Sequence, residues 1–225
     1  MGNLTPLISN PEETVQQIIE RAKESANKFD GEGDGGFYYT REREDHRPVS
    51  PGMNTFSAGI PTRYVNCTLE GFVGNDKLRD GLRKMAGESI LLTGPTGTGK
   101  THLAVAIMKE INKDRSMFIT VPNLLMKIRD CFRKDSAQTE QGIVDEYATY
   151  DALCLDDLGA EKTSEFSIAT LYLILDKRVS NLKQTIVTSN LSLAEIEQLL
   201  GARISSRLSE MKVAKITMPD YRKKR

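Results

Sequence analysis

Cysteine and histidine are scarce in this sequence, and tryptophan is missing altogether. The three cysteines, Cys67, Cys131 and Cys154, lie far apart, and the two histidines are His46 and His102. Zinc sites need about four such ligands, usually in closely spaced pairs. The sequence therefore argues against a zinc site. We expect the cysteines to be free thiols in a reducing, cytoplasmic environment.

The chain also lacks an excess of charge and a long hydrophobic run. Its 31 basic residues balance its 31 acidic residues, so no overall field attracts it to DNA or to a membrane, and any contact with nucleic acid must be local. No apolar run approaches the roughly 20 residues that a membrane-spanning helix needs. The first residues do not have the charged and then apolar plan of a signal peptide. We expect a cytoplasmic protein without membrane contact.

What the sequence does contain is a glycine-rich loop, Gly94-Pro95-Thr96-Gly97-Thr98-Gly99-Lys100-Thr101. It lies between an apolar run at 89–92 and a helical pattern at 101–111, which predicts strand, loop and helix in that order. In such a loop the backbone N–H groups and the helix N-terminus bind phosphate, Lys100 neutralises the β and γ phosphates, and the Thr101 hydroxyl ligates Mg²⁺. A glycine-rich turn that only joins a strand to a helix is the alternative. We expect a nucleoside triphosphate site, to which we also assign Tyr64 and His102.

Further apolar runs alternate with helical patterns along the chain. The expected strands are 89–93, 117–121, 152–155 and 184–188, and the expected helices are 75–84, 101–111, 123–132 and 164–179. This alternation predicts a three-layer α/β fold, with a mostly parallel sheet covered by helices on both faces. Ligands of such sheets bind at the carboxyl ends of the strands.

The first 58 residues differ in character from the rest. Apolar residues recur at helical spacing over 11–28, which predicts an amphipathic helix within residues 1–29. This helix either packs on the main domain or docks on a partner. Glycines at 31, 33, 35 and 36 and prolines at 48 and 51 predict a flexible linker over 30–58. The nucleotide-binding domain is therefore expected over 59–225.

Two acids follow the expected strand at 152–155. A buried strand can deliver a carboxylate to Mg²⁺ at a fixed distance from the glycine loop, so we expect Asp156 to lie on the metal side. Asp157 is then expected to orient the attacking water as a general base. An ordinary acidic turn is the alternative. Asn190, at the end of the next strand, is expected to bind this water or the γ-phosphate.

Arg203 and Arg207 are four residues apart and therefore share one face of a helix. An arginine supplied across a subunit interface can stabilise charge on the γ-phosphate of a neighbouring subunit. A solvated or ion-paired helix face is the alternative.

A family resemblance rests on segments that occur in a fixed order. These are Ile60-Pro61-Thr62-Arg63-Tyr64, the glycine loop, Leu155-Asp156-Asp157-Leu158-Gly159-Ala160-Glu161-Lys162, Thr188-Ser189-Asn190, 203–208 and Asp220-Tyr221-Arg222. With them the chain resembles, over about 59–225, the DnaC-type loaders of bacterial replicative helicases, which are AAA+ ATPases, and the related IstB-type transposition helpers.

The resemblance implies a five-stranded AAA+ core that binds ATP and Mg²⁺. It also implies self-association, with nucleotide between neighbouring subunits, and contact with single-stranded DNA. By position it implies that Lys100 and Thr101 belong to Walker A, Asp156 and Asp157 to Walker B, and Asn190 to sensor 1. It assigns the arginine finger to Arg207, with Arg203 close behind, and a possible sensor 2 to Arg222.

The sequence departs from larger AAA+ proteins because only a short segment follows Arg207, so we expect an abbreviated or absent lid. The scarcity of cysteine and histidine excludes the N-terminal zinc-binding domain of some loaders. Four basic residues after the second strand are candidates for DNA contact, although a solvated helix face is the alternative. They are Lys127, Arg129, Arg133 and Lys134.

We therefore expect a loader that helps place a hexameric replicative helicase on single-stranded DNA, with slow ATP hydrolysis stimulated by DNA or partner. A transposition helper that binds DNA and a transposase is the first alternative. Asp156-Asp157-Leu158-Gly159 favours the loader. A nucleotide-dependent scaffold with negligible turnover is the second alternative, and turnover with and without single-stranded DNA separates it from the others.

Overall fold

The computed structural model describes residues 59–221 except for 74, 133–135, 137 and 161–163. The expected N-terminal helix and linker, and also Arg133, Lys134 and Arg222, lie outside the described residues. None of the helices in the described part is long and apolar enough to cross a bilayer.

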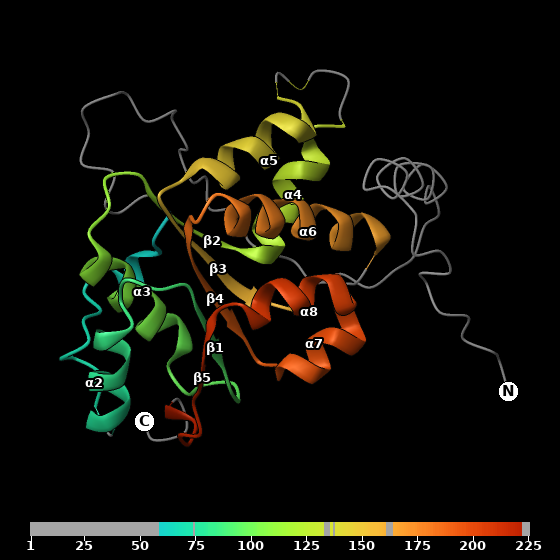
Figure 1. Cartoon of the computed structure of the whole chain (residues 1–225). Helices are drawn as coiled ribbons and strands as arrows, with labels where there is room; N and C mark the ends of the chain where they lie inside the picture. Colours follow the sequence, from blue (N-terminus) through green and yellow to red (C-terminus); the bar gives the residue numbers. More distant parts are fainter. Residues whose placement is uncertain (1–58, 74, 133–135, 137, 161–163, 222–225) are drawn as a thin grey trace, which may run out of the picture.

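A parallel five-stranded sheet forms the centre of the fold, with the strand order β2-β3-β4-β1-β5 (Figure 1). The strands are β1 (Ile90–Thr93), β2 (Ser116–Thr120), β3 (Ala152–Leu158), β4 (Gln184–Ser189) and β5 (Lys212–Lys215). The helices are η2 (Thr62–Tyr64), α2 (Asp76–Lys84), α3 (Lys100–Ile111), α4 (Val121–Asp130), α5 (Glu140–Thr149), α6 (Glu165–Ser180), α7 (Leu193–Leu200) and α8 (Ala202–Ser209). The predicted three-layer α/β architecture with five parallel strands is confirmed.

Both faces of the sheet are buried, and neighbouring residues of a strand contribute to opposite cores. In β1, Ile90 and Leu92 belong to the core with α2, α3 and residues 67–72, whereas Leu91 belongs to the core with α4 to α8. Figure 1 shows α2 and α3 on one side of the sheet and α4 and α6 on the other. This two-sided burial explains why the first four strands read as nearly continuous apolar runs.

The structure corrects two boundaries: β3 continues to Leu158 and contains both acids, and β2 ends at Thr120 because Val121 already begins α4. The Thr120 side chain accepts a hydrogen bond from the Asn123 N–H and so caps the helix, and Pro122 occupies its first turn, where it loses no helical hydrogen bond. The predicted strand to 121 and helix from 123 were therefore wrong by one and two residues at this junction.

Beyond β5, residues 216–221 pass along the glycine loop and contain no α-helix among the described positions. The Ile216 N–H donates to the Thr93 carbonyl oxygen at 2.7 Å, and the Tyr221 N–H donates to that of Gly97 at 3.0 Å.

Candidate nucleotide-binding site

The glycine loop connects β1 to α3, at the carboxyl end of the central strands. Two of its glycines have positive φ angles, and another chain segment approaches each of them closely: backbone at Gly94 and a side chain at Gly97. A Cβ on Gly94 (φ +144°) would lie 2.1 Å from the Ile216 carbonyl oxygen, and one on Gly97 (φ +80°) would lie 1.8 Å from Asp220 Oδ1. The loop is thus packed against residues 216–221, and its N–H groups lead into the N-terminus of α3.

Lys100 is the first residue of α3, and its side chain is buried with 6% of the residue exposed. Its Nζ donates to the carbonyl oxygens of Gly94 and Pro95, both at 2.8 Å, and to Asn190 Oδ1 at 2.7 Å. These three oxygen atoms help to hold the ammonium group over the loop. Because Asn190 follows β4, this bond brings together two predicted site residues that are 90 positions apart.

Asp156 lies in β3 and is the centre of a hydrogen-bond network. Thr101 Oγ1 lies 3.1 Å from both oxygens of its carboxylate, and Thr188 Oγ1 donates to Asp156 Oδ1 at 2.7 Å. Only 3% of Asp156 is exposed, and this burial is the main cause that raises its pKa from an ordinary 3.8 to about 6. Asp157 also raises this pKa, while the bonds from Thr188 and Thr101 and the charge of Lys100 lower it.

A hydroxyl and a carboxylate at this spacing fit the hard oxygen ligands that Mg²⁺ prefers. Thr101 and Asp156 are the predicted metal-side residues, and the structure places them next to each other at the N-terminus of α3. These two residues would hold the metal ion.

Asp157 adopts a left-handed backbone conformation with φ +59°, which is uncommon for a residue other than glycine. The pairing between β3 and β4 shifts register between Leu155 and Leu158, and the Asp157 N–H donates to Thr188 Oγ1 at 2.9 Å. This irregularity leaves Asp157 only half-buried, whereas Asp156 is buried. The two adjacent acids thus occupy different environments.

The described contacts of Tyr64 and His102 are with residues outside this network. Tyr64 ends η2 and packs against the core that contains α3, with the Arg63 guanidinium 5.8 Å from its ring centre. His102 Nε2 lies 2.9 Å from the Thr68 carbonyl oxygen, and its ring packs near Phe72. Both residues join the segment 62–72 to α3, and their predicted nucleotide contacts stay predictions.

Arg203 and Arg207 share one face of α8, as predicted, but their described partners belong to α6 and to the end of α8. Arg207 pairs with Asp176 and Glu210, and the Arg203 guanidinium lies 6.0 Å from the centre of the Tyr172 ring. The structure therefore does not join them to the network around Lys100.

Thr188 is a site residue to which the sequence assigned no role. It bridges the Asp156 carboxylate and the Asp157 N–H. Its position two residues before Asn190, at the end of a buried strand, was the available signal.

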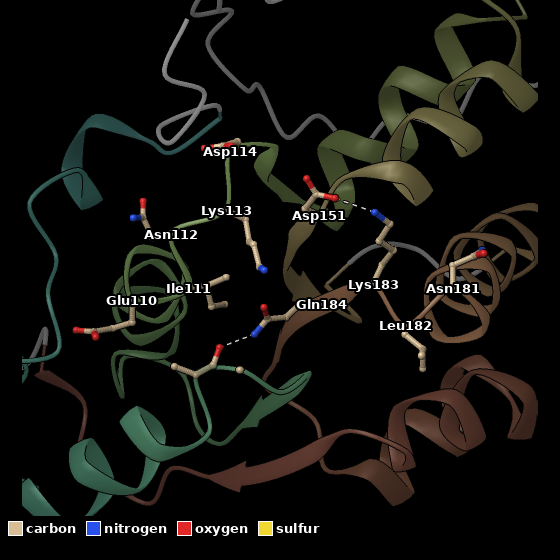
Figure 2. A pocket seen from close by; sticks show the side chains of 12 residues that line it. Glu110, Ile111, Asn112, Lys113, Asp114, Asp151, Asn181, Leu182, Lys183 and Gln184 are labelled. Carbon is tan, nitrogen blue, oxygen red and sulfur yellow. Dashed lines mark hydrogen bonds and ion pairs between the residues drawn. The ribbon is translucent and has the colours of Figure 1, made fainter. Parts of the chain in front are cut away.

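A separate hollow of about 680 Å³ lies at the opposite edge of the sheet, where the strands begin (Figure 2). Its lining has both signs of charge, and Lys183 pairs with Asp151 at 2.7 Å. Since parallel sheets bind ligands at the carboxyl ends of their strands, this hollow is not the nucleotide site.

Comparisons with known proteins agree with this geometry. A family model described as IstB-like ATP binding protein matches residues 84–213, which is more than half of the chain. The chain belongs to this family. Membership confirms the predicted ATP-binding AAA+ class and supports ATPase activity in general.

Relatives of this chain include proteins named as replicative helicase loaders. The replicative helicase loader DnaC of Escherichia coli K12 is 28% identical over 169 residues, which cover 69% of each chain. A crystal structure of the DnaC helicase loader superposes with a TM-score of 0.60 and 25% identity, covering 71% of this chain and all of the other. The AMPPCP-bound DnaA from Aquifex aeolicus has a TM-score of 0.58 at 22% identity, covering 72% of this chain and 53% of that one, and shares the fold.

The raised pKa of Asp156 predicts how stability depends on pH in the protein without metal or nucleotide. Because the folded chain holds this proton more tightly than the unfolded chain, the ionised carboxylate costs stability above about pH 6, and the cost disappears below 3.8. Relative to Asp156→Asn, the wild-type protein should lose up to about 3 kcal/mol of unfolding free energy between pH 4 and pH 7. Denaturant unfolding in a chelating buffer measures this difference, and parallel pH profiles of the two proteins would contradict it.

Proposed function

We propose that this chain is a helicase loader that binds ATP with Mg²⁺, self-associates, and helps place a hexameric replicative helicase on single-stranded DNA. The observation that carries the ATP-dependent part is the network that joins Lys100, Asn190, Thr101 and Asp156 at one edge of the sheet. The client is supported by similarity to loaders, since this chain matches 69% of the length of E. coli DnaC and superposes on all of the chain in the DnaC helicase loader crystal structure.

Lys100 binds the β and γ phosphates in this proposal. In the described conformation its ammonium group contacts the Asn190 amide oxygen and two carbonyl oxygens. A phosphate oxygen that takes the place of the Asn190 oxygen releases this amide to face the γ-phosphate. Asn190 thereby responds to the presence of the γ-phosphate, which is the role expected of it.

Thr101 and Asp156 hold Mg²⁺, which when bound neutralises charge on the phosphate oxygens. Asp156 must be ionised to bind a cation, and the hydrogen bonds from Thr101 and Thr188 favour that form. Thr188 also fixes the backbone of Asp157, so that one hydroxyl orients both acids. Asp157 then accepts a proton from the water that attacks the γ-phosphate.

Replacing Asp157 with asparagine should leave ATP bound while reducing hydrolysis by about 10²- to 10⁴-fold, the usual contribution of a general base. The amide has a similar shape but cannot take the proton. Single-turnover hydrolysis of radiolabelled ATP measures the rate, and filter binding on the same sample measures the affinity. Wild-type turnover in this variant would remove Asp157 as the base.

Hydrolysis is proposed to be slow until DNA or the client is present, and contact with DNA to be local. Lys127 and Arg129 lie on α4, where Arg129 is exposed and Lys127 is partly exposed. Pairing of these cations with phosphates would weaken as salt rises. Turnover with and without single-stranded DNA separates an ATPase from a scaffold with negligible turnover.

The transposition helper is the less favoured candidate. The family model takes its name from such ATP-binding proteins, but the relatives described above are named as helicase loaders.

A further inference from the structure

Two pairs of side chains face each other where α6 packs against α8. Tyr172 and Asp176 are one helical turn apart on α6, and Arg203 and Arg207 are one turn apart on α8. The Arg203 guanidinium lies 6.0 Å from the centre of the Tyr172 ring, and Arg207 reaches Asp176. The matched spacing sets the register of the two helices and fixes where both arginines lie.

Arg207 is held more firmly than an ordinary surface arginine. Its Nε and one terminal nitrogen both lie 2.8 Å from Asp176 Oδ1, and its other terminal nitrogen lies 3.0 Å from Glu210 Oε1. The Tyr172 hydroxyl donates to the same Asp176 oxygen at 3.4 Å, which steadies the acceptor. About a third of the Arg207 side chain remains exposed, so the oriented cation still reaches the surface of α8.

We propose that Asp176 is the positioning residue for Arg207 and holds its guanidinium ready for the nucleotide of a neighbouring subunit. The inference rests on the trans role of Arg207 in the proposed function. A long arginine side chain loses much rotamer freedom when it is ordered, and Asp176 orders it before the subunits meet. The guanidinium has five N–H donors in a rigid fork, so Asp176 along one edge and Glu210 at the other terminal nitrogen still leave donors for a phosphate.

A purely structural role for this ion pair predicts little change on mutation, because partly exposed pairs contribute little to stability. A positioning role predicts a loss of turnover, because small misplacements of a catalytic group cost up to about 100-fold in rate. The two roles therefore differ in the quantity that changes.

Asp176→Ala is expected to lower kcat of the assembled full-length ATPase by about 10- to 100-fold, with KM for ATP unchanged. Asp176→Asn keeps an oxygen that can accept both N–H groups, so it should recover most of this loss. Asp145→Ala is the matched control. It removes an ion pair to Lys177, which directly follows Asp176 on α6, and Asp145 is not among the described partners of Arg207. It should retain wild-type kcat.

Mixing and double substitution link the effect to Arg207. Asp157→Asn subunits carry an intact Arg207 and an intact Asp176, so a mixture of them with Asp176→Ala subunits should regain turnover. In a chain that already has Arg207→Ala, adding Asp176→Ala should not lower turnover further. If Asp176→Ala has wild-type or raised turnover while Arg207→Ala is impaired, the positioning role of Asp176 is wrong but the trans role of Arg207 stands. Wild-type turnover in Arg207→Ala would instead overturn the trans arginine, and this inference with it. If Asp176→Ala does not fold, Asp176→Leu, which keeps a branched side chain and removes the acceptor, distinguishes the same outcomes.

Discussion

Replacing Lys100 with alanine is expected to abolish tight ATP binding. The Lys100 ammonium is buried over the glycine loop and donates to three oxygen atoms there, so its loss leaves the phosphate charge without the cation that this loop supplies. A hydrogen bond to a charged group is worth about 1.5–3 kcal/mol, and losing two of them lowers affinity by about 100-fold or more. Titration with a fluorescent ATP analogue measures the change.

A matched control separates this effect from a general loss of positive charge. Lys113 lies beyond the end of α3 at the opposite edge of the sheet, where it lines the hollow of Figure 2. Lys113→Ala should therefore bind ATP as the wild type does. If Lys100→Ala also kept wild-type affinity, the assignment of this loop as a phosphate site would be wrong.

Replacing Arg207 with alanine is expected to leave nucleotide affinity of the isolated chain unchanged but to reduce turnover in the assembly. An arginine supplied in trans is worth about 10³ to 10⁵ in rate in well-studied phosphoryl-transfer enzymes. The structure supports a role outside the chain's own site, because the described partners of Arg207 lie on α6 and at Glu210. Turnover measured across a range of protein concentrations gives the effect for the assembled form.

Mixed assemblies test whether Arg207 acts across the interface. An Arg207→Ala subunit has an intact Asp157, and an Asp157→Asn subunit has an intact Arg207. A mixture therefore contains interfaces in which both residues are intact, and it should regain activity that neither variant has alone. A mixture as inactive as its components would place Arg207 outside a trans role.

The fold was predictable wherever burial leaves a mark on the sequence. The strands β1 to β4 are buried on both faces and appear as apolar runs, and the glycine loop follows the first of them. The fifth strand could not be recognised from its sequence pattern. It is the outermost strand of the sheet, and its residues Lys212, Val213 and Lys215 are exposed. Only the family resemblance implied five strands.

Two helices were missed although each has a local signal. Helix α5 is capped by the Thr139 side chain, and α7 begins with a capping box formed by Ser192 and Glu195. Both caps are visible in the sequence, but the helices that follow have only ten and eight residues and so give a short apolar pattern. The misplaced start of α4 also involves a cap, since Thr120 was read as part of the strand.

The site was predictable as a set of residues but not as a network. Both Lys100 and Asn190 were expected beyond the carboxyl ends of parallel strands, and the strand order brings them together because β1 and β4 are neighbours. The left-handed Asp157 and its bond to Thr188 depend on a register shift between β3 and β4, which no local pattern reveals. The contact between Asp176 and Arg207 depends on how α6 docks on α8, and the two residues are 31 positions apart.

The proposal that the client is a replicative helicase is tested most directly by capture from the native cell extract. The bait is the full-length Asp157→Asn chain, which should hold ATP without hydrolysing it, and mass spectrometry identifies the bound proteins. The account predicts the hexameric replicative helicase in the ATP-dependent fraction, and its loss when residues 1–29, the predicted partner-binding segment, are removed. A transposase in that fraction, with the helicase absent, would contradict the proposed client.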